Sequence, residues 1–350
     1  MHKKPKDRDF IRTVEGMFFC VTGYLHPPDR YTAYLKYSPD PAGRWRARHE
    51  DIAYRREIPY YHVRSVAETI GYLEQHYPHY VSDCPVRGIR FSMVPQASVA
   101  QYYDPRTRLQ ALIATPSDPL EVEARDLAVE IAASAGISAA DLGVTGSILI
   151  GLHHPALSDI NLTVYGGENG RRVRDALRER QGRRPAVRPP DDALLARWAE
   201  EMAAWFPLTL EEAAYNVGRR WNYGVYRGRF FGIHPTRSDA EITEQYGDHV
   251  YRGQGRARIR AALTAADEAI FQPAIYRVGA VRVLAGDAAA EGVQEVISYE
   301  GRYRDIAKVG QTIEAVGQLE TVDGEPRRLV VGAAALDGAE YIKPTEDREK

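Results

Sequence analysis

Apolar positions between residues 10 and 116 are spaced mainly as in β-strands. β-branched and aromatic residues concentrate in short runs that predict strands, at 17–24, 31–37 and 88–94. A His-Pro-Pro-Asp segment separates the first two runs and favours a hairpin with a longer loop. Val66, Ile70 and Leu73 recur at helical spacing and predict a helix over 63–77. We therefore expect an N-terminal α+β domain over residues 1–116.

Helical spacing opens the central segment, which we place at residues 117–272. Asp118 is a candidate N-cap, with Pro119 at the first helical position and Glu121 three residues after the cap. The apolar stripe that follows stops at Gly136, a residue type common just after helices. The pattern then predicts a helix over 191–205, a helix starting at the Thr209–Glu212 capping box, a strand over 226–235 and a last helix over 256–271.

After Pro273 the apolar residues return to short runs separated by glycine. These runs predict strands at 275–284, 295–299, 312–321 and 327–333. Such spacing is typical of a small all-β barrel or sandwich, which we place at residues 273–350. An oligonucleotide-binding barrel is one of several small barrels that fit, so the role of this domain stays open.

The composition agrees with a folded protein and excludes a general nucleic-acid coat protein. The 350 residues are 44% hydrophobic and 27% charged, with a formal net charge of −2. Of the 46 basic residues, 39 are Arg and only seven are Lys. A coding bias explains such a ratio, and so does selection for phosphate and base contacts, which arginine forks suit.

Cysteine content and hydropathy indicate the compartment. Cys20 and Cys84 are too few for a disulfide framework or a cysteine-based metal site, which favours a reduced cytoplasmic environment. No run approaches the roughly 18 apolar residues that a membrane-spanning helix needs. We therefore expect a cytoplasmic protein with no membrane partner.

One segment, residues 143–166, carries recognisable chemistry. Gly146 and Ser147 form a tight turn into a short predicted helix at 148–154, and a strand follows at 157–165. The free N–H groups at such a helix start are suited to bind phosphate. Asp159 and Asn161 are two apart on the strand, so their side chains share one face. This arrangement could hold a metal ion beside a polyphosphate.

These residues resemble the nucleotidyltransferase superfamily related to DNA polymerase β, whose motif is Gly-Ser, a short helix, then Ser-Asp-x-Asp on a strand. The whole chain is also similar to predicted nucleotidyltransferases found mainly in archaea. The resemblance implies a nucleotidyltransferase-like mixed sheet with helices at 117–272. It further implies that Gly146, Ser147 and Ser158 contact nucleotide phosphates, that Asp159 and the Asn161 position hold Mg²⁺ or Mn²⁺, and that the substrate is a nucleoside triphosphate.

Two departures from the family pattern weaken the case for catalysis. Asn161 stands where the family has a second Asp, and a neutral amide is a poorer Mg²⁺ ligand than a carboxylate. A third carboxylate is expected on a later strand, but residues 229–236 contain no acid. Asp239 and Glu241 lie just beyond that strand and are more typical of solvent-facing loop residues.

The positive charge is concentrated after the motif. Residues 215–237 contain aromatic side chains and no acid, together with Arg219, Arg220, Arg227, Arg229 and Arg237. Cations interleaved with aromatics suit phosphates and stacked bases, although a solvated helix end in an arginine-biased chain would look the same. Residues 171–190 are also arginine-rich and are more typical of a solvated linker. The histidines, including His153 and His234, lack zinc-site spacing and fit loop or capping positions.

Three functional hypotheses follow. The first is a metal-dependent nucleotidyltransferase that moves a nucleoside monophosphate from an NTP to a hydroxyl, with RNA as one candidate acceptor and Arg219, Arg220, Arg227 and Arg229 on the phosphates. The second is a catalytically degenerate form of the same fold that binds nucleotide or RNA. The third is an accessory subunit whose arginine-rich face contacts protein. The acceptor, the base preference and the oligomeric state are not determined by the sequence.

Overall fold

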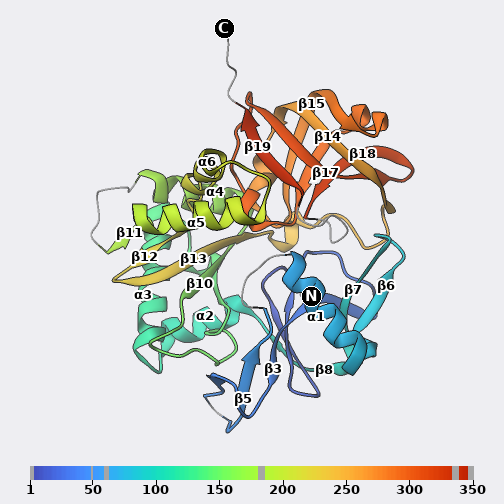
Figure 1. Ribbon diagram of the computed structural model, residues 1–350. Coiled ribbons are helices and arrows are strands. Elements are labelled where there is room, and N and C mark those ends of the chain that lie inside the picture. The colour runs from blue at the N-terminus through green and yellow to red at the C-terminus, as the bar shows by residue number, and fades with distance from the viewer. Residues whose placement is uncertain (1–3, 49, 59–62, 180–185, 333–338, 346–350) are drawn as a thin grey trace.

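The protein is a mixed α+β structure with three sheets and six helices in the part of the chain that is described. The computed structural model describes residues 4–48, 50–58, 63–179, 186–332 and 339–345. In Figure 1 the blue N-terminal sheet and the green central sheet lie below an orange and red C-terminal barrel. None of the described helices has the length and apolarity needed to cross a lipid bilayer.

The N-terminal sheet has eight strands. Six follow the order β4-β5-β3-β2-β1-β8, while β7 pairs with β3 and β6. Their bounds are Phe10–Thr13 (β1), Phe18–Val21 (β2), Arg30–Pro39 (β3), Trp45–Arg46 (β4), Ala53–Arg56 (β5), Val81–Cys84 (β6), Ile89–Pro95 (β7) and Val99–Tyr103 (β8). The predicted helix is confirmed as α1 (Val63–His76), and the β2–β3 hairpin is confirmed as antiparallel.

The central sheet has the order β11-β12-β13-β10-β9. Its strands are Leu142–Thr145 (β9), Ile160–Tyr165 (β10), Val187–Arg188 (β11), Tyr223–Tyr226 (β12) and Arg229–Thr236 (β13). β10 and β13 are parallel, with Asn161 opposite Gly232 and Thr163 opposite His234. Two helices, α2 (Pro105–Ala114) and α3 (Pro119–Ala135), contribute leucines and Ile131 to the core of this sheet.

The helix ends that depend on local capping are confirmed. Asp118 caps α3 by accepting a hydrogen bond from the Glu121 N–H, and Gly136 ends the helix in the left-handed conformation. Asp191 caps α5 (Asp192–Trp205). α6 (Leu210–Gly218) begins with both bonds of the Thr209–Glu212 capping box. Since α5 and α6 share a core with the C-terminal strands, they belong with the barrel rather than with the central sheet.

The C-terminal strands form a barrel. The order is β14-β15-β16-β18-β17-β19, and the additional β14–β17 pairing closes the first five strands on themselves. Their bounds are Tyr251–Ala265 (β14), Ala274–Gly286 (β15), Glu295–Ser298 (β16), Thr312–Val322 (β17), Glu325–Val331 (β18) and Tyr341–Thr345 (β19). The pattern after Pro273 therefore located four barrel strands.

The helix expected at 256–271 is wrong. This segment is the second half of β14 followed by a 3-10 turn, Asp267–Ile270. Alternate apolar residues are buried in the barrel, namely Ala257, Ile259, Ala261 and Leu263, with arginines between the first three. Ala and Arg favour helices in isolation, but pairing with strands on both sides overrides that preference.

Two other expectations need correction. Residues 148–154 form turns rather than a short helix, with the Leu152 N–H donating to the Ser147 carbonyl at 2.9 Å. The stretch at 171–190 is not a simple linker, because α4 spans Gly167–Glu179. Two arginines of α4, Arg174 and Arg178, pair with Asp305 near the barrel. Residues 180–185 of that stretch lie outside the described residues.

Candidate functional site

The motif loop, defined as residues 146–153, is held between two hydrophobic cores. Ile148 is buried in the core of the central sheet. Leu149, Ile150 and Leu152 are buried in a core of the N-terminal sheet, among aromatic residues of β1, β2 and β3. The Arg48 N–H also donates to the Gly151 carbonyl at 3.1 Å. The N-terminal domain is therefore packed directly against the motif.

The three residues expected to contact phosphate come together, but two of their side chains are buried. Gly146 has φ +69°, a conformation that favours glycine. Ser147 is 7% exposed and Ser158 is 3% exposed, and their hydroxyls lie 3.2 Å apart. The Ser158 hydroxyl also accepts from the His154 N–H at 2.9 Å. These hydroxyls fix the shape of the loop.

Asp159 and Asn161 have different surroundings at the start of β10. Asp159 is exposed, and its charge acts on the buried Lys36 of β3. Asn161 is half-buried, with its Oδ1 3.0 Å from His234 Nε2. His234 lies on the neighbouring strand β13 and is 4% exposed. A histidine therefore contacts Asn161 from the strand where the resemblance expects a third carboxylate.

The two acids after β13 are used elsewhere. Asp239 forms an ion pair with Lys6. Glu241 accepts hydrogen bonds from the Gly167 N–H and the Ser238 N–H, both at 2.8 Å, and so anchors the start of α4. Asp159 belongs to no group of three metal-ligating side chains among the described residues. With one carboxylate, one amide already paired and cations nearby, these residues do not fit a two-metal centre.

Basic side chains from all three sheets surround His234. We define the cationic cluster as Arg8, Lys36, Arg220 and Arg304 around His234. Burial lowers the pKa of His234 well below its usual range, and the four cations lower that pKa further. Arg8 precedes β1, Lys36 lies on β3, Arg220 precedes β12 and Arg304 lies between β16 and β17. The cluster therefore marks the junction of the three parts of the molecule.

A cleft beside this junction is lined by cations and aromatic rings. It has a volume of about 260 Å³, and its lining includes Arg178, Arg188, Arg219, Arg220, Lys308, Trp221 and Tyr223 but no carboxylate from the described residues. The Arg219 guanidinium lies 4.0 Å from the Tyr215 ring, and Arg220 lies 4.3 Å from the Tyr223 ring. Burial alone would raise the pKa of Tyr223, but Arg220 and Arg304 help to lower it overall.

The arginine run at 215–237 is divided by the fold. Only Arg219 and Arg220 line the cleft. The other three pair with acids that are distant in sequence: Arg227 with Asp126, Arg229 with Glu123 and Arg237 with Glu268. Arg229 also donates to the Ser158 carbonyl at 2.9 Å, next to Asp159. The local excess of positive charge read from the sequence is therefore partly neutralised by α3 and by the turn before β15.

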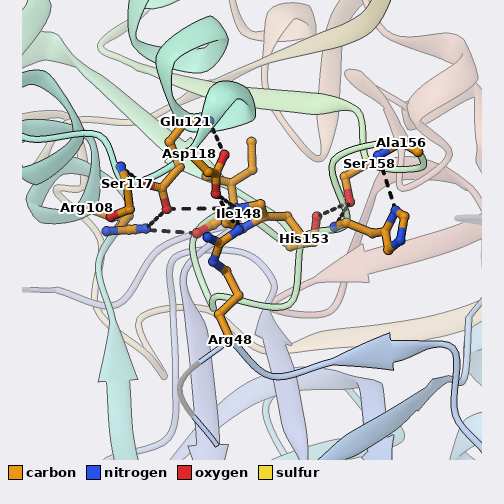
Figure 2. Close-up of polar contacts among 11 residues, drawn as sticks. Arg48, Arg108, Ser117, Asp118, Glu121, Ile148, His153, Ala156 and Ser158 are labelled. Atoms are coloured by element: carbon orange, nitrogen blue, oxygen red, sulfur yellow. Dashed lines mark hydrogen bonds and ion pairs between the residues drawn. The ribbon is translucent and has the colours of Figure 1, made fainter.

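A second buried polar group contains His153 of the motif loop. We define the balanced cluster as Arg48, Arg108, Asp118, Glu121 and His153, shown in Figure 2. His153 Nε2 lies 2.8 Å from Asp118 Oδ2 and 2.9 Å from Arg48 Nη1, and Arg108 pairs with the buried Glu121. The Asp118, Glu121 and His153 ligand atoms are close enough to hold a metal ion. Arg48 and Arg108 already neutralise both carboxylates, although His153 Nδ1 is buried without a hydrogen-bond partner in the described structure.

Sequence reasoning missed three members of the cationic cluster. Arg8 and Arg304 are far from the motif in the chain and carry no local signal. Lys36 did carry one, because it is a lone charge inside the apolar strand run at 31–37 and is 3% exposed. His234 was noted only as a loop or capping residue, although it is a buried strand residue.

The comparisons with known proteins extend over the whole chain but name no activity. The chain is similar to the uncharacterized protein MJ1086 of Methanocaldococcus jannaschii, with 29% identity over 346 residues, covering 97% of this chain and 99% of that protein. No family model matches the chain, and no solved structure matches it. The function is therefore argued from the geometry of the site.

Proposed function

We propose that this protein is a cytoplasmic nucleotide-binding protein, built on a nucleotidyltransferase-like fold that has lost two-metal catalysis. The observation that carries the proposal is the cleft, which in the described part of the chain is lined by five basic side chains, three aromatic rings and no carboxylate. Its volume lies just below the range of about 300–1,000 Å³ typical of small-molecule sites. Guanidinium groups suit phosphate oxygens, and aromatic rings suit a base.

The resemblance in the motif supports the fold part of this proposal. Gly146, Ser147, Ser158 and Asp159 follow one another as in that superfamily, and β10 and β13 are neighbouring parallel strands of one mixed sheet. The contact between Asn161 and His234 supports the loss of metal-dependent transfer, because neither group is an anionic ligand for Mg²⁺. RNA is the alternative ligand, since its phosphates and bases offer the same chemistry.

The experiment is isothermal titration of the full-length protein with ATP, GTP, AMP and a short single-stranded RNA. We expect Arg219→Gln to weaken nucleotide binding about tenfold or more, because a hydrogen bond to a charged group contributes about 1.5–3 kcal/mol. Arg227→Gln is the matched control from the same arginine run, since Arg227 pairs with Asp126 instead of lining the cleft. Equal losses in both variants, or no binding by the unsubstituted protein, would refute the proposal.

Nucleotidyl transfer is the second candidate, and the exposed carboxylate of Asp159 favours it. Incubation with α-labelled NTPs, Mg²⁺ or Mn²⁺ and total RNA tests it directly. We expect no label transfer. Transfer that disappears in Asp159→Ala, while nucleotide binding is kept, would replace the binding proposal with the enzymatic one. Transfer that persists in Asp159→Ala would indicate a contaminating enzyme.

A further inference from the structure

The cationic cluster contains buried donors that the protein itself does not satisfy. Arg304 is 6% exposed, and its Nε and Nη1 atoms are buried without a hydrogen-bond partner among the described residues. Its Nη2 donates to Gln272 Oε1 at 2.9 Å. His234 Nδ1 and Arg220 Nε are likewise buried without a partner in the described structure. Unpaired buried donors are rare and costly, so they indicate a missing acceptor.

The charges of the cluster are also not balanced. Within the described residues, Arg220 and Arg304 form no salt bridge with a carboxylate. The buried carboxyl that acts on Arg304 is Asp7, which lies 3.4 Å from Arg8 Nε and whose pKa is raised by burial. Burial also lowers the pKa of Lys36 well below its usual range, and Arg56 lowers that pKa further. An arrangement of this kind is stabilised when an anion enters it.

The geometry of the rings defines where such an anion would lie. The Tyr223 ring is 6.3 Å from the His234 ring in an edge-to-face arrangement, and Arg220 lies over Tyr223 and Trp198. The Tyr223 hydroxyl is a further donor whose surroundings are positive. Tyr223 and Arg220 also line the cleft, and so connect it with the cluster.

We propose that the cationic cluster is an oxyanion site that binds a phosphate group, either inorganic phosphate or the terminal phosphate of a nucleotide, at the junction of the three sheets. The site occupies the place where the resemblance expects metal ions, and guanidinium groups from the N-terminal and C-terminal parts of the chain supply the positive charge instead. It does not require nucleotide binding in the cleft. A bound phosphate would hold the three parts together, because each contributes a donor.

The test is calorimetric titration of the full-length protein with sodium phosphate, with sodium chloride at matched ionic strength as the reference. We expect saturable phosphate binding that Arg304→Gln and Lys36→Met each weaken about tenfold or more. Arg87→Gln is the control, because this buried arginine donates to the Tyr299 hydroxyl at 3.0 Å and lies outside the cluster. Circular dichroism spectra and gel filtration verify that each variant is folded.

Further arms separate this inference from the proposed function. Phosphate binding that survives Arg219→Gln, and that competes with ATP but not with AMP, supports a site for the terminal phosphate. Phosphate binding without any nucleotide binding leaves the inference standing, identifies inorganic phosphate as the occupant and refutes the proposed function. Nucleotide binding that is unchanged in Arg304→Gln, together with no response to phosphate, overturns the inference and leaves the proposed function intact. A response to phosphate that chloride reproduces is an ionic-strength effect and also overturns it.

Discussion

The balanced cluster and the cationic cluster lie beside the same motif loop, yet they differ in how far their buried charges are neutralised by opposite charges. In the balanced cluster, Asp118 and Glu121 face Arg48 and Arg108, and each carboxylate has a basic partner. In the cationic cluster, four basic side chains act on His234, and among the described residues the buried acid beside them is Asp7, which acts on Arg8 and Arg304. A self-sufficient network serves folding, whereas an unbalanced one gains its partner from outside. The difference separates a structural region from a ligand-binding one.

The largest expected effect is in the balanced cluster. Glu121→Ala removes the partner of Arg108 and the acceptor of the Ser117 N–H, whose bond is 2.7 Å long. We expect the free energy of unfolding in urea to fall by about 3 kcal/mol, because Glu121 is 1% exposed and its loss deprives both Arg108 and the Ser117 N–H of this acceptor. Glu123→Ala, on the same helix, breaks the more accessible pair with Arg229 and should cost about 1 kcal/mol or less. Equal losses in the free energy of unfolding would show that Glu121 contributes no more to stability than Glu123.

For a substitution in the cationic cluster, we expect the change in the free energy of unfolding to have the opposite sign. Arg304→Met removes a buried positive charge that forms no salt bridge in the described structure, although the buried Asp7 acts on it electrostatically. In phosphate-free buffer we expect the free energy of unfolding to stay the same or rise by about 1 kcal/mol, since an apolar side chain tolerates burial better than an unpaired ion. A loss of more than about 2 kcal/mol in the same urea experiment would mean that the cluster is already compensated.

The pH dependence of stability gives a smaller effect. The pKa of Lys36 is lowered in the folded protein, so above that lowered pKa the unfolded chain binds more protons and stability rises with pH. The groups that act on Lys36 are Arg56, Arg8, Cys20 and Asp159. We expect the difference in stability between the natural protein and Lys36→Met to change in favour of the natural protein from pH 7 to pH 9. A constant difference would place Lys36 at an ordinary pKa.

The smallest effect is expected at the edge of the balanced cluster. The Arg48 side chain is 26% exposed, and its partner Asp118 is also held by the Glu121 N–H and by His153. We expect Arg48→Ala to cost about 1 kcal/mol or less in urea unfolding, because Asp118 keeps its bonds to the Glu121 N–H and to His153. A double-mutant cycle with Asp118→Ala measures the pair alone. A coupling energy as large as that of the Arg108–Glu121 pair would show that the two ion pairs contribute equally to stability.

Local signals predicted much of the fold. The caps predicted at Asp118 and Thr209 were correct because they depend on side chains within three residues of the helix start. The strand β14 was taken for a helix because its burial comes from pairing with β15 and β17, which no local pattern contains. The conformation of residues 148–154 was also mispredicted because it depends on contacts that are distant in sequence. Neighbouring residues of this segment are buried in two different hydrophobic cores.

The candidate site was predictable only in its continuous part. Residues 146–161 were located because they are close in the chain, and the Asn161 departure was visible at once. The run from Arg219 to Arg237 looked uniformly unbalanced, but distant acids neutralise three of its five arginines. Conversely, Arg304 and Lys36 gain their importance from residues on other sheets. Charge balance depends on which residues the fold brings together, so it cannot be predicted from a short stretch of sequence.

Because the motif loop packs into two cores, it affects whether a truncated protein can fold. Leu149, Ile150 and Leu152 complete a core that otherwise belongs to the N-terminal domain. A fragment ending before residue 117 would lack these three side chains and expose the aromatic surface that they cover. We therefore expect that the N-terminal domain does not fold on its own when cut at that boundary, and that the two regions unfold together.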